Sequence, residues 1–227
     1  MPPAELPIVN PDEIAGQPRI GTDEAGKGDY FGDLVVAGVY LDAAGEALAR
    51  ELGVMDSKKL SDARVKALAK EIRLAFPHDI LRISPSKYND LYAKMKNLNR
   101  LLAWAHARVI ENLLPRTGAP LAVSDQFGSA EVLENALMHA GRTVRLVQIT
   151  QGERDLAVAA ASILARATFL YRLDALSKEI GITLPKGATH VLPVGHQLYA
   201  KGGTALLGQV AKLHFKTTEQ IIGKGYL

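Results

Sequence analysis

"RIGTDEAGKGDYFGDLVVAGVYL", residues 19–41, joins two strand-like segments through a glycine-rich turn. The first eight residues are typical of a short strand that enters a turn. Residues 33–41 are mostly apolar and include three β-branched valines, as expected for a buried strand. Gly26 and Gly28 flank Lys27 in the turn, and such glycines indicate close approach of the backbone to a ligand. Two neighbouring acids, Asp23 and Glu24, come just before this turn.

Helical and strand-like patterns alternate along the rest of the chain, which predicts an α/β layered fold with a mixed sheet. Such folds place their sites where strands end, and both Asp23 and Asp125 lie at predicted strand ends. We expect Pro115 to end the second helix. The predicted strands are 79–85, 120–125 and 142–150, and the predicted helices are 61–76, 98–115, 129–141, 156–181 and one near 204–215.

Composition sets the class of protein but not its activity. The 227 residues include 48% hydrophobic residues, enough for a sizeable core in one large domain or a domain with an appendage. The sequence has no cysteine, so disulfides and thiolate metal sites are excluded. Net charge is +3, which permits nucleic-acid binding without establishing it. No secretory signal or membrane span is visible, and we expect a cytoplasmic protein.

The glycine turn admits three interpretations. Gly21, Gly26 and Lys27 fit most of a nucleotide-binding P-loop, but Gly28 replaces its hydroxyl residue and the two acids would repel phosphates. An ordinary surface turn is the second interpretation. In the third, the carboxylates bind a divalent cation, because two neighbouring acids are costly unless positive charge lies between them.

A metal-dependent phosphodiester hydrolase needs further carboxylates from separate segments, which would bind two ions about 4 Å apart. Asp125 is one candidate, although an aspartate there could equally start a turn or cap a helix. Glu153 and Asp155 in "QGERD" are candidates for the fourth. Acids are also favoured at the first turn of a helix for electrostatic reasons, so a structural role is an alternative for both.

Seven motifs occur in order along the chain: GTDEAGKGDYFG (21–32), DSKKLSD (56–62), NLNRLLAWAH (97–106), VSDQFG (123–128), AVAAASILAR (157–166), LPKGA (184–188) and AKLHF (211–215). With these motifs the chain resembles the type 2 ribonucleases H, and ribonuclease HIII among them, from about residue 19 to the C-terminus. This resemblance implies an RNase H-like fold with a central mixed β-sheet flanked by helices and a C-terminal helical region. It also implies an endonuclease (EC 3.1.26.4) that cleaves the RNA strand of RNA–DNA hybrids with two Mg²⁺ or Mn²⁺ ions, leaving 5′-phosphate and 3′-hydroxyl ends.

The resemblance also implies the site residues. The metal-binding and catalytic acids are Asp23, Glu24, Asp125 and Glu153, with Asp155 as the alternative fourth. Backbone groups of a glycine turn would contact the ribose 2′-hydroxyl, which only RNA offers. The expected substrate-binding residues are Gly26, Lys27, Gly28, Ser57, Lys58, Lys59 and Lys186, although the lysines could simply be solvated.

Other polar residues of these motifs have weaker assignments. Thr22, Ser162 and Arg166 are candidates for supporting the metal ligands or contacting phosphate, and Ser162 could equally be a small packing residue. We interpret His106 as structural and Trp104 as a core residue. His214 could lie near the substrate or be structural.

The chain departs from the family pattern at three places. Ribonucleases HIII usually carry an N-terminal substrate-binding domain shaped like half of the TATA-binding protein. The residues before the catalytic motif are too few for such a domain, so we expect a short leader at 1–18 and a catalytic domain at 19–227. The segment between the fourth acid and AVAAAS is one residue shorter than the resemblance to ribonuclease HIII implies, which favours Glu153 over Asp155. Asp33 stands where the family usually has proline, and its role is unassigned.

Two other activities and a set of partners complete the sequence-based expectations. Cleavage at single ribonucleotides embedded in DNA, as in ribonuclease HII, is the main alternative. A P-loop-like nucleotide-binding protein is the distant one. We expect a monomer in DNA replication and repair that binds RNA–DNA hybrid and has no protein or membrane partner.

Overall fold

The computed structural model describes residues 8–125, 144–149 and 152–223; for Asp125 and Glu153 it describes the backbone alone. The helix predicted at 129–141 therefore lies outside the described residues. The chain forms two compact units. The first comprises residues 1–24, 36–81 and 97–167, and the second comprises 25–35, 82–96 and 168–227.

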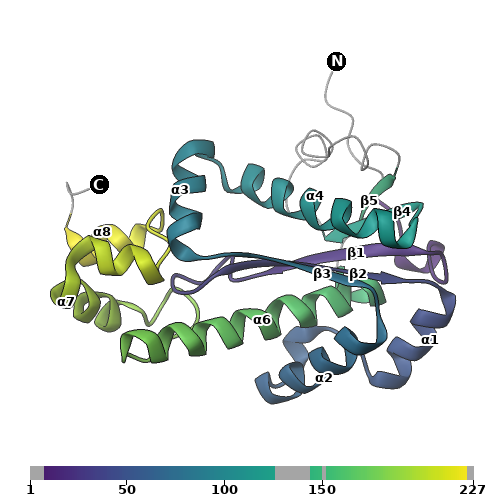
Figure 1. Cartoon of the computed structure of the whole chain (residues 1–227), viewed down its shortest axis with the longest axis horizontal. Helices are drawn as coiled ribbons and strands as arrows, with labels where there is room; N and C mark the ends of the chain where they lie inside the picture. The colour runs from purple at the N-terminus through teal and green to yellow at the C-terminus, as the bar shows by residue number, and fades with distance from the viewer. Residues whose placement is uncertain (1–7, 126–143, 150–151, 224–227) are drawn as a thin grey trace. The chain divides into compact units, whose positions relative to one another are not determined.

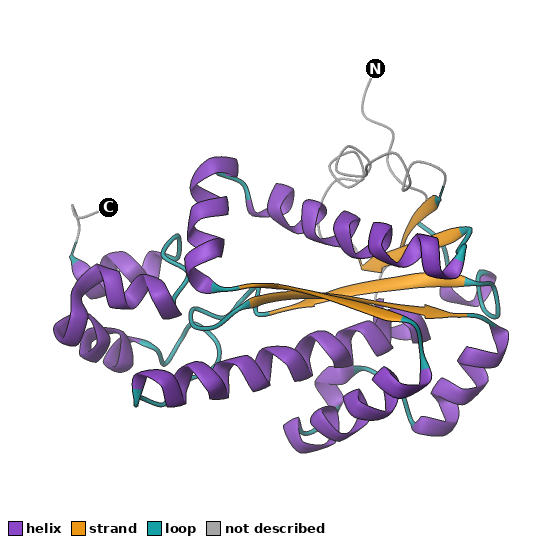
Figure 2. Cartoon of the chain, in the orientation of Figure 1, coloured by secondary structure: helices purple, strands orange, loops and turns teal. Residues whose placement is uncertain are grey.

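A five-stranded sheet, orange in Figure 2 and labelled strand by strand in Figure 1, has the strand order β3-β2-β1-β4-β5. Strands β1, β4 and β5 are parallel neighbours, with Thr22 opposite Ser124 and Asp125 opposite Ile149. The carboxyl ends of β1 and β4 consequently lie at the same edge of the sheet, and the predicted mixed sheet is confirmed. The strands are β1 (Arg19–Ala25), β2 (Leu34–Leu41), β3 (His78–Ile83), β4 (Leu121–Asp125) and β5 (Arg145–Ile149).

Helices cover both faces of this sheet in the first unit (Figure 1). Helix α4 (Leu98–Thr117) lies on one face, where Val109 and Leu113 pack beneath Gly38 of β2. The first residues of α6 (Leu156–Ile180) lie on the other face, which α1 (Ala43–Leu52) and α2 (Asp62–Ala75) also cover. Residues of the predicted leader join this core, since Ile14 is buried there beside Val158.

Strand β1 and helix α6 approach each other so closely that only glycine fits between them. A Cβ atom on Gly21 would lie 2.3 Å from the backbone of both Ala157 and Val158. The alanine-rich start of α6 makes this approach possible because small side chains let the two backbones meet. Since side chains alternate along a strand, Thr22 then faces α4 on the opposite side.

The second unit contains the C-terminal helical region. Helix α7 (Leu192–Val210) packs against α3 (Pro85–Met95) and α8 (Lys216–Ile222). The side-chain amide of Asn89 in α3 donates hydrogen bonds to the carbonyl oxygens of Gly208 at 3.2 Å and Ala211 at 3.0 Å. These bonds hold the end of α7 against α3.

Two predicted helix ends were wrong. The helix expected near 204–215 does follow a break in α7, because Gly202 and Gly203 have non-helical backbone angles, but it stops at Val210, after which Ala211 pairs with Phe31 as an isolated bridge. Pro115 does not end α4 but lies in its last turn, and α4 continues to Thr117. A proline so near the end removes one backbone hydrogen bond, and Gly118 then closes the helix with a left-handed conformation, φ 60°.

Helix α6 is long and apolar enough to cross a membrane by length and composition alone, with a mean hydropathy of 1.4 over an 18-residue window. In the structure, 72% of that window is buried within the protein. The apolar character of α6 is thus accounted for by contacts inside the protein, as in the core helix of a globular domain.

We predict that Gly21→Ala lowers the free energy of unfolding by about 3 kcal/mol, because the added methyl group would force β1 and α6 apart. Chemical denaturation measures this change. Gly28→Ala is the matched control, since a Cβ at Gly28 meets nothing within 4 Å, and its stability should change by less than about 0.5 kcal/mol. Equal stability of the two variants would contradict the close contact.

Candidate active site

Asp23 and Glu24 are neighbours in sequence, but helices on opposite faces of the sheet hold their side chains. The Asp23 carboxylate accepts hydrogen bonds from the Ser162 hydroxyl of α6 and, at 2.8 Å, from the backbone N–H of Glu24. Oε2 of Glu24 lies 3.2 Å from Nε2 of His106 in α4. The end of β1 therefore presents two carboxylates, each held from a different side.

Burial makes the charged form of Asp23 costly. Desolvation, reinforced by the neighbouring Glu24, raises the pKa of Asp23 to about 6, although the bonds from Ser162 and the Glu24 amide oppose the shift. Two partly buried acids at one strand end favour a cation with oxygen ligands, because positive charge would relieve both the desolvation and the mutual repulsion.

The backbone places the third and fourth predicted acids near this strand end. Asp125 ends β4, one residue beyond the pair of Thr22 and Ser124, so its Cα lies at the same sheet edge as Asp23. Glu153 lies in a short 3₁₀ helix, η4 (Gly152–Arg154), which contacts β4. Among the described residues no group of three acids or histidines is placed to bind a metal, and that description excludes the side chains of Asp125 and Glu153.

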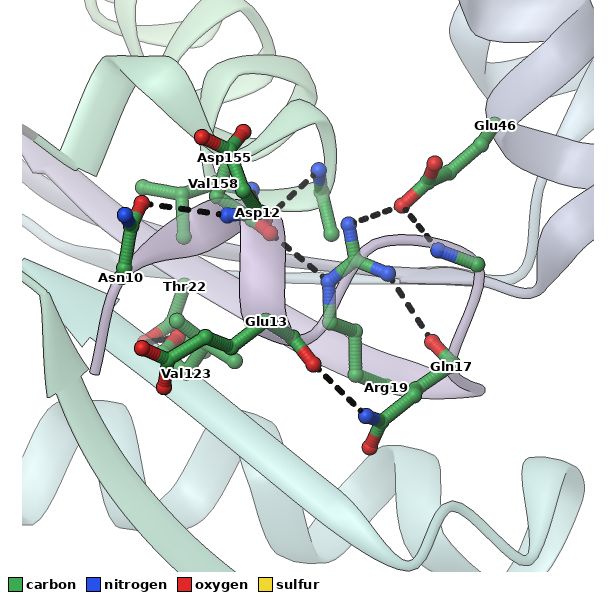
Figure 3. Close-up of polar contacts among 12 residues, drawn as sticks. Asn10, Asp12, Glu13, Gln17, Arg19, Thr22, Glu46, Val123, Asp155 and Val158 are labelled. Carbon is green, nitrogen blue, oxygen red and sulfur yellow. Dashed lines mark hydrogen bonds and ion pairs between the residues drawn. The ribbon is translucent and has the colours of Figure 1, made fainter.

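Asp155 has a structural role that uses both of its carboxylate oxygens (Figure 3). Oδ2 accepts a hydrogen bond of 2.7 Å from Nε of Arg19, and Oδ1 accepts bonds from the backbone N–H groups of Ala157 and Val158 at 2.9 and 3.0 Å. Asp155 is 2% exposed. It therefore caps the start of α6 and pairs with the start of β1.

A buried ion-pair network extends from Asp155, and the sequence reasoning missed it. The guanidinium of Arg19 also pairs with Glu46 of α1 and donates a hydrogen bond of 2.9 Å to the carbonyl oxygen of Gln17. Glu46 in turn accepts a bond of 3.1 Å from the backbone N–H of Gly16 (Figure 3). The network ties α1, the start of β1 and the start of α6 together.

Ser57, expected to contact substrate, is buried and bonded to a residue that supports Asp23. Its hydroxyl lies 2.8 Å from that of Ser162, and its carbonyl oxygen accepts a hydrogen bond from Arg166. Arg166 also pairs with Asp62 at 2.7 Å. Ser57 begins the 3₁₀ helix η2 (Ser57–Lys59), whose Lys58 and Lys59 side chains are exposed. Hydroxyl contacts thus connect the lysine-bearing segment to Asp23.

The turn that contains Gly26, Lys27 and Gly28 belongs to the second unit. Gly26 adopts φ 85°, in the left-handed region that favours glycine, and Gly28 is exposed. Asp29 accepts a hydrogen bond of 2.6 Å from the N–H of Gly187 through its carboxylate. The structure therefore brings two sequence motifs together in this unit: the glycine turn and the "LPKGA" loop, whose Lys186 is exposed.

A buried lysine, Lys212, is hydrogen-bonded to the backbone of the same turn. Nζ of Lys212 donates hydrogen bonds to the carbonyl oxygens of Asp29 at 2.8 Å and Gly32 at 2.7 Å. Burial lowers the pKa of Lys212 to about 8, although Asp29 and Asp33 oppose that shift. Lys212 is the second residue of the final motif, AKLHF, so this motif holds the glycine turn in place.

Asp33, whose role the sequence left unassigned, forms a buried ion pair. It is 2% exposed and lies 3.4 Å from Nε of Arg172. Burial raises the pKa of Asp33, and the positive charge of Arg172 opposes the shift. Within the second unit, this ion pair therefore links the end of the glycine turn to Arg172 of α6.

The two histidines discussed from sequence differ in their surroundings. His106 contacts Glu24, so its interpretation as merely structural is incomplete. His214 packs against Tyr92, with ring centroids 4.3 Å apart, and burial lowers the pKa of its imidazole. These contacts suit a structural role for His214. Trp104, expected in the core, is only partly buried.

A family model for ribonuclease HII matches residues 20–218 of this chain. Ribonuclease HIII of Protochlamydia amoebophila is 46% identical over 208 residues, which cover 91% of this chain and 69% of that protein. Ribonuclease HIII of Chlamydia abortus is 46% identical over 209 residues, which cover 90% of this chain and 70% of that protein.

Solved structures agree with the family match. The crystal structure of Bst-RNase HIII in complex with Mn²⁺ superposes with a TM-score of 0.87 at 31% identity, covering 93% of this chain and 71% of that one. RNase H3 of Aquifex aeolicus gives a TM-score of 0.74 at 32% identity, covering 88% and 73%. RNase HII in the PCNA:RNase HII complex of Archaeoglobus fulgidus gives 0.71 at 29% identity, covering 92% and 98%.

We predict that Asp23→Asn stabilises the metal-free protein. The unfolded-state carboxyl ionises near pH 3.8 and the folded-state carboxyl near 6, so the wild type loses stability as pH rises through this interval and the variant does not. In chelator at pH 8 the variant should unfold with a free energy about 2 kcal/mol higher, measured by urea denaturation. A variant less stable than the wild type at pH 8 would contradict the proposed cost of burial.

Proposed function

This chain belongs to the ribonuclease HII family, the type 2 ribonucleases H, and is an endonuclease of the ribonuclease H type, and we propose that it hydrolyses RNA–DNA hybrids. The proposed catalytic residues are Asp23, Glu24, Asp125 and Glu153. The pair at the end of β1 is the observation that carries this proposal. Each of the two carboxylates is held from its own face of the sheet, at the edge where β4 also ends.

Divalent-metal dependence is supported by the Mn²⁺ complex of the similar Bst-RNase HIII. The residues of this chain fit such a cofactor, because the raised pKa of Asp23 marks a carboxylate that lacks sufficient positive charge nearby. We propose two ions, Mg²⁺ or Mn²⁺, bound by the four acids. When bound, they activate water and neutralise the charge that develops on the leaving 3′ oxygen.

The chain's own residues orient these ligands. Ser162 and the Glu24 amide fix the Asp23 carboxylate. Asp155, two residues after Glu153, pairs with Arg19 and fixes the start of α6. Such pre-organisation matters because displaced ligands lose much of their effect on a transition state.

Substrate binding in this proposal uses phosphate contacts and one contact that is specific for RNA. Lys58 and Lys59 are exposed and would bind phosphates as point charges, as would Lys186. Gly26 and Gly28 allow the backbone of the turn to approach a ribose 2′-hydroxyl, which DNA lacks. This contact would restrict cleavage to the RNA strand.

We assign the fourth ligand to Glu153 rather than Asp155. Both oxygens of Asp155 accept hydrogen bonds, from Arg19 and from the N–H groups at the start of α6, so a metal bound by Asp155 would compete with these three bonds. Glu153 lies two residues earlier, in η4, which contacts β4.

A second candidate activity is cleavage at single ribonucleotides embedded in DNA. It is favoured by the ribonuclease HII model, and by the Archaeoglobus fulgidus RNase HII, 98% of which this chain covers. The ribonuclease HIII relatives, at 46% identity, favour cleavage within longer RNA tracts. We propose cleavage within longer RNA tracts as the principal activity.

We predict that Glu153→Gln reduces the cleavage rate at least about 100-fold while leaving the melting temperature nearly unchanged, because it removes a ligand charge. Asp155→Asn should instead lower the melting temperature clearly, because its bond to Arg19 is weakened, and should reduce the cleavage rate less than Glu153→Gln does. Single-turnover cleavage and thermal melts of both variants test this. Strong loss of rate in the Asp155 variant alone, with unchanged melting, would reverse the assignment.

We predict that the wild type cleaves a hybrid with a long RNA strand at least about tenfold faster than a duplex with one ribonucleotide, because several 2′-hydroxyls can occupy the turn. One gel compares the two substrates with Mg²⁺ and with Mn²⁺. Faster cleavage at the lone ribonucleotide would establish the second activity instead, and two uncut substrates would refute both.

A further inference from the structure

His106 is a fully buried histidine that connects two residues of β1. It lies in α4 and is 0% exposed. Its Nδ1 atom is 2.8 Å from the hydroxyl oxygen of Thr22, and its Nε2 atom is 3.2 Å from Oε2 of Glu24. Thr22 and Glu24 are two residues apart and so face the same side of the sheet. The ring therefore runs along β1 and is bonded at both nitrogen atoms.

The hydrogen atoms of these contacts follow from the partners. A carboxylate only accepts hydrogen bonds, so Nε2 carries the hydrogen and donates it to Glu24. The Thr22 hydroxyl can either donate to or accept from Nδ1, so the second contact persists whichever form the ring adopts. The imidazole is consequently fixed in orientation, and with it one oxygen of Glu24.

The part of α4 around His106 is buried. Ala105 and Ala107, on either side of His106 in the sequence, are both buried, and Val109 of the same helix packs beneath Gly38. The Thr22 hydroxyl also points towards the carbonyl oxygen of Val123 in β4, at 3.5 Å. A change at position 106 would therefore be transmitted first to β1 and to the Glu24 side chain.

We propose that His106 is a positioning residue that fixes the Glu24 carboxylate for binding a divalent ion. This inference rests on the proposed function, in which Glu24 is a metal ligand. Carboxylates that bind metals are commonly oriented by hydrogen bonds from neighbouring residues, and loss of such a neighbour typically weakens metal binding about 10–100-fold. The contact of 3.2 Å between Nε2 of His106 and Oε2 of Glu24 is the observation that carries this role.

Two substitutions separate this role from a purely structural one. In His106→Gln the terminal amide nitrogen can take the place of Nε2 and still donate to Glu24. In His106→Asn the shorter amide can replace Nδ1 beside Thr22 but cannot reach Glu24. Val109→Ala serves as the matched control, because it loosens the same buried face of α4 three residues farther along the chain.

The experiment measures Mn²⁺ binding without substrate, by the electron paramagnetic resonance signal of free Mn²⁺, alongside thermal melts and the Mn²⁺ dependence of cleavage. We expect His106→Asn to raise the dissociation constant for Mn²⁺ by about 10–100-fold, and His106→Gln by no more than about threefold. Val109→Ala should lower the melting temperature without changing the dissociation constant.

Three outcomes would overturn the proposal. Unchanged Mn²⁺ affinity in His106→Asn would do so directly, and so would an equal loss of affinity in Val109→Ala. If Glu24→Gln binds Mn²⁺ as the wild type does, then Glu24 is not a ligand and the proposed site fails together with this inference. The first of these outcomes, combined with weakened Mn²⁺ binding by Glu24→Gln, overturns the role of His106 alone and leaves the proposed site intact.

Discussion

The contact between the backbones of β1 and α6 at Gly21 sets the geometry of the first unit. Because no side chain separates these elements, Ser162 comes within hydrogen-bonding distance of Asp23. The same approach allows Arg19, at the start of β1, to pair with Asp155 at the start of α6. Strand β1, which carries Asp23 and Glu24, is thus bonded near both of its ends to the segment that begins α6 and follows Glu153 in the chain.

Among the residues that the structure describes, two groups of buried or partly buried acids differ in the partners that hold them. Asp155 and Glu46 pair with Arg19, and Asp33 pairs with Arg172, so guanidinium groups balance their charge. Asp23 instead accepts hydrogen bonds from a hydroxyl and a backbone amide, and Glu24 from an imidazole. The first group stabilises the fold. The second retains negative charge at a strand end, which stabilises the metal-free protein less but suits a cation.

Much of the fold follows from local sequence signals, and the exceptions have physical causes. The helix at 61–76 was predicted from Ser61, whose side chain does cap α2. Helices α1 and α3 were not predicted, although Asp42 and the Ser84-Pro85 pair are helix-start signals that the sequence offered. The end of α7 could not be predicted, because it depends on the bridge between Ala211 and Phe31, which are far apart in the chain.

The candidate site divides in the same way. Asp23 and Glu24 could be singled out from their spacing to the glycine turn. The structural role of Asp155 could not, because its partner Arg19 is 136 positions away and two acids near a helix start look alike in sequence. The contact between His106 and Glu24, 82 positions apart, was hidden for the same reason. Local patterns indicate which residues are chemically suitable, and tertiary contacts decide how each is used.

The central claim is that acids from three segments bind two divalent ions at the shared edge of β1 and β4. Anomalous diffraction from crystals of this protein containing Mn²⁺ and an RNA–DNA hybrid tests it most directly. The account predicts two manganese peaks about 4 Å apart, coordinated by Asp23, Glu24, Asp125 and Glu153 and lying against one phosphate of the RNA strand. Manganese bound by Asp155, or bound away from the end of β1, would contradict it.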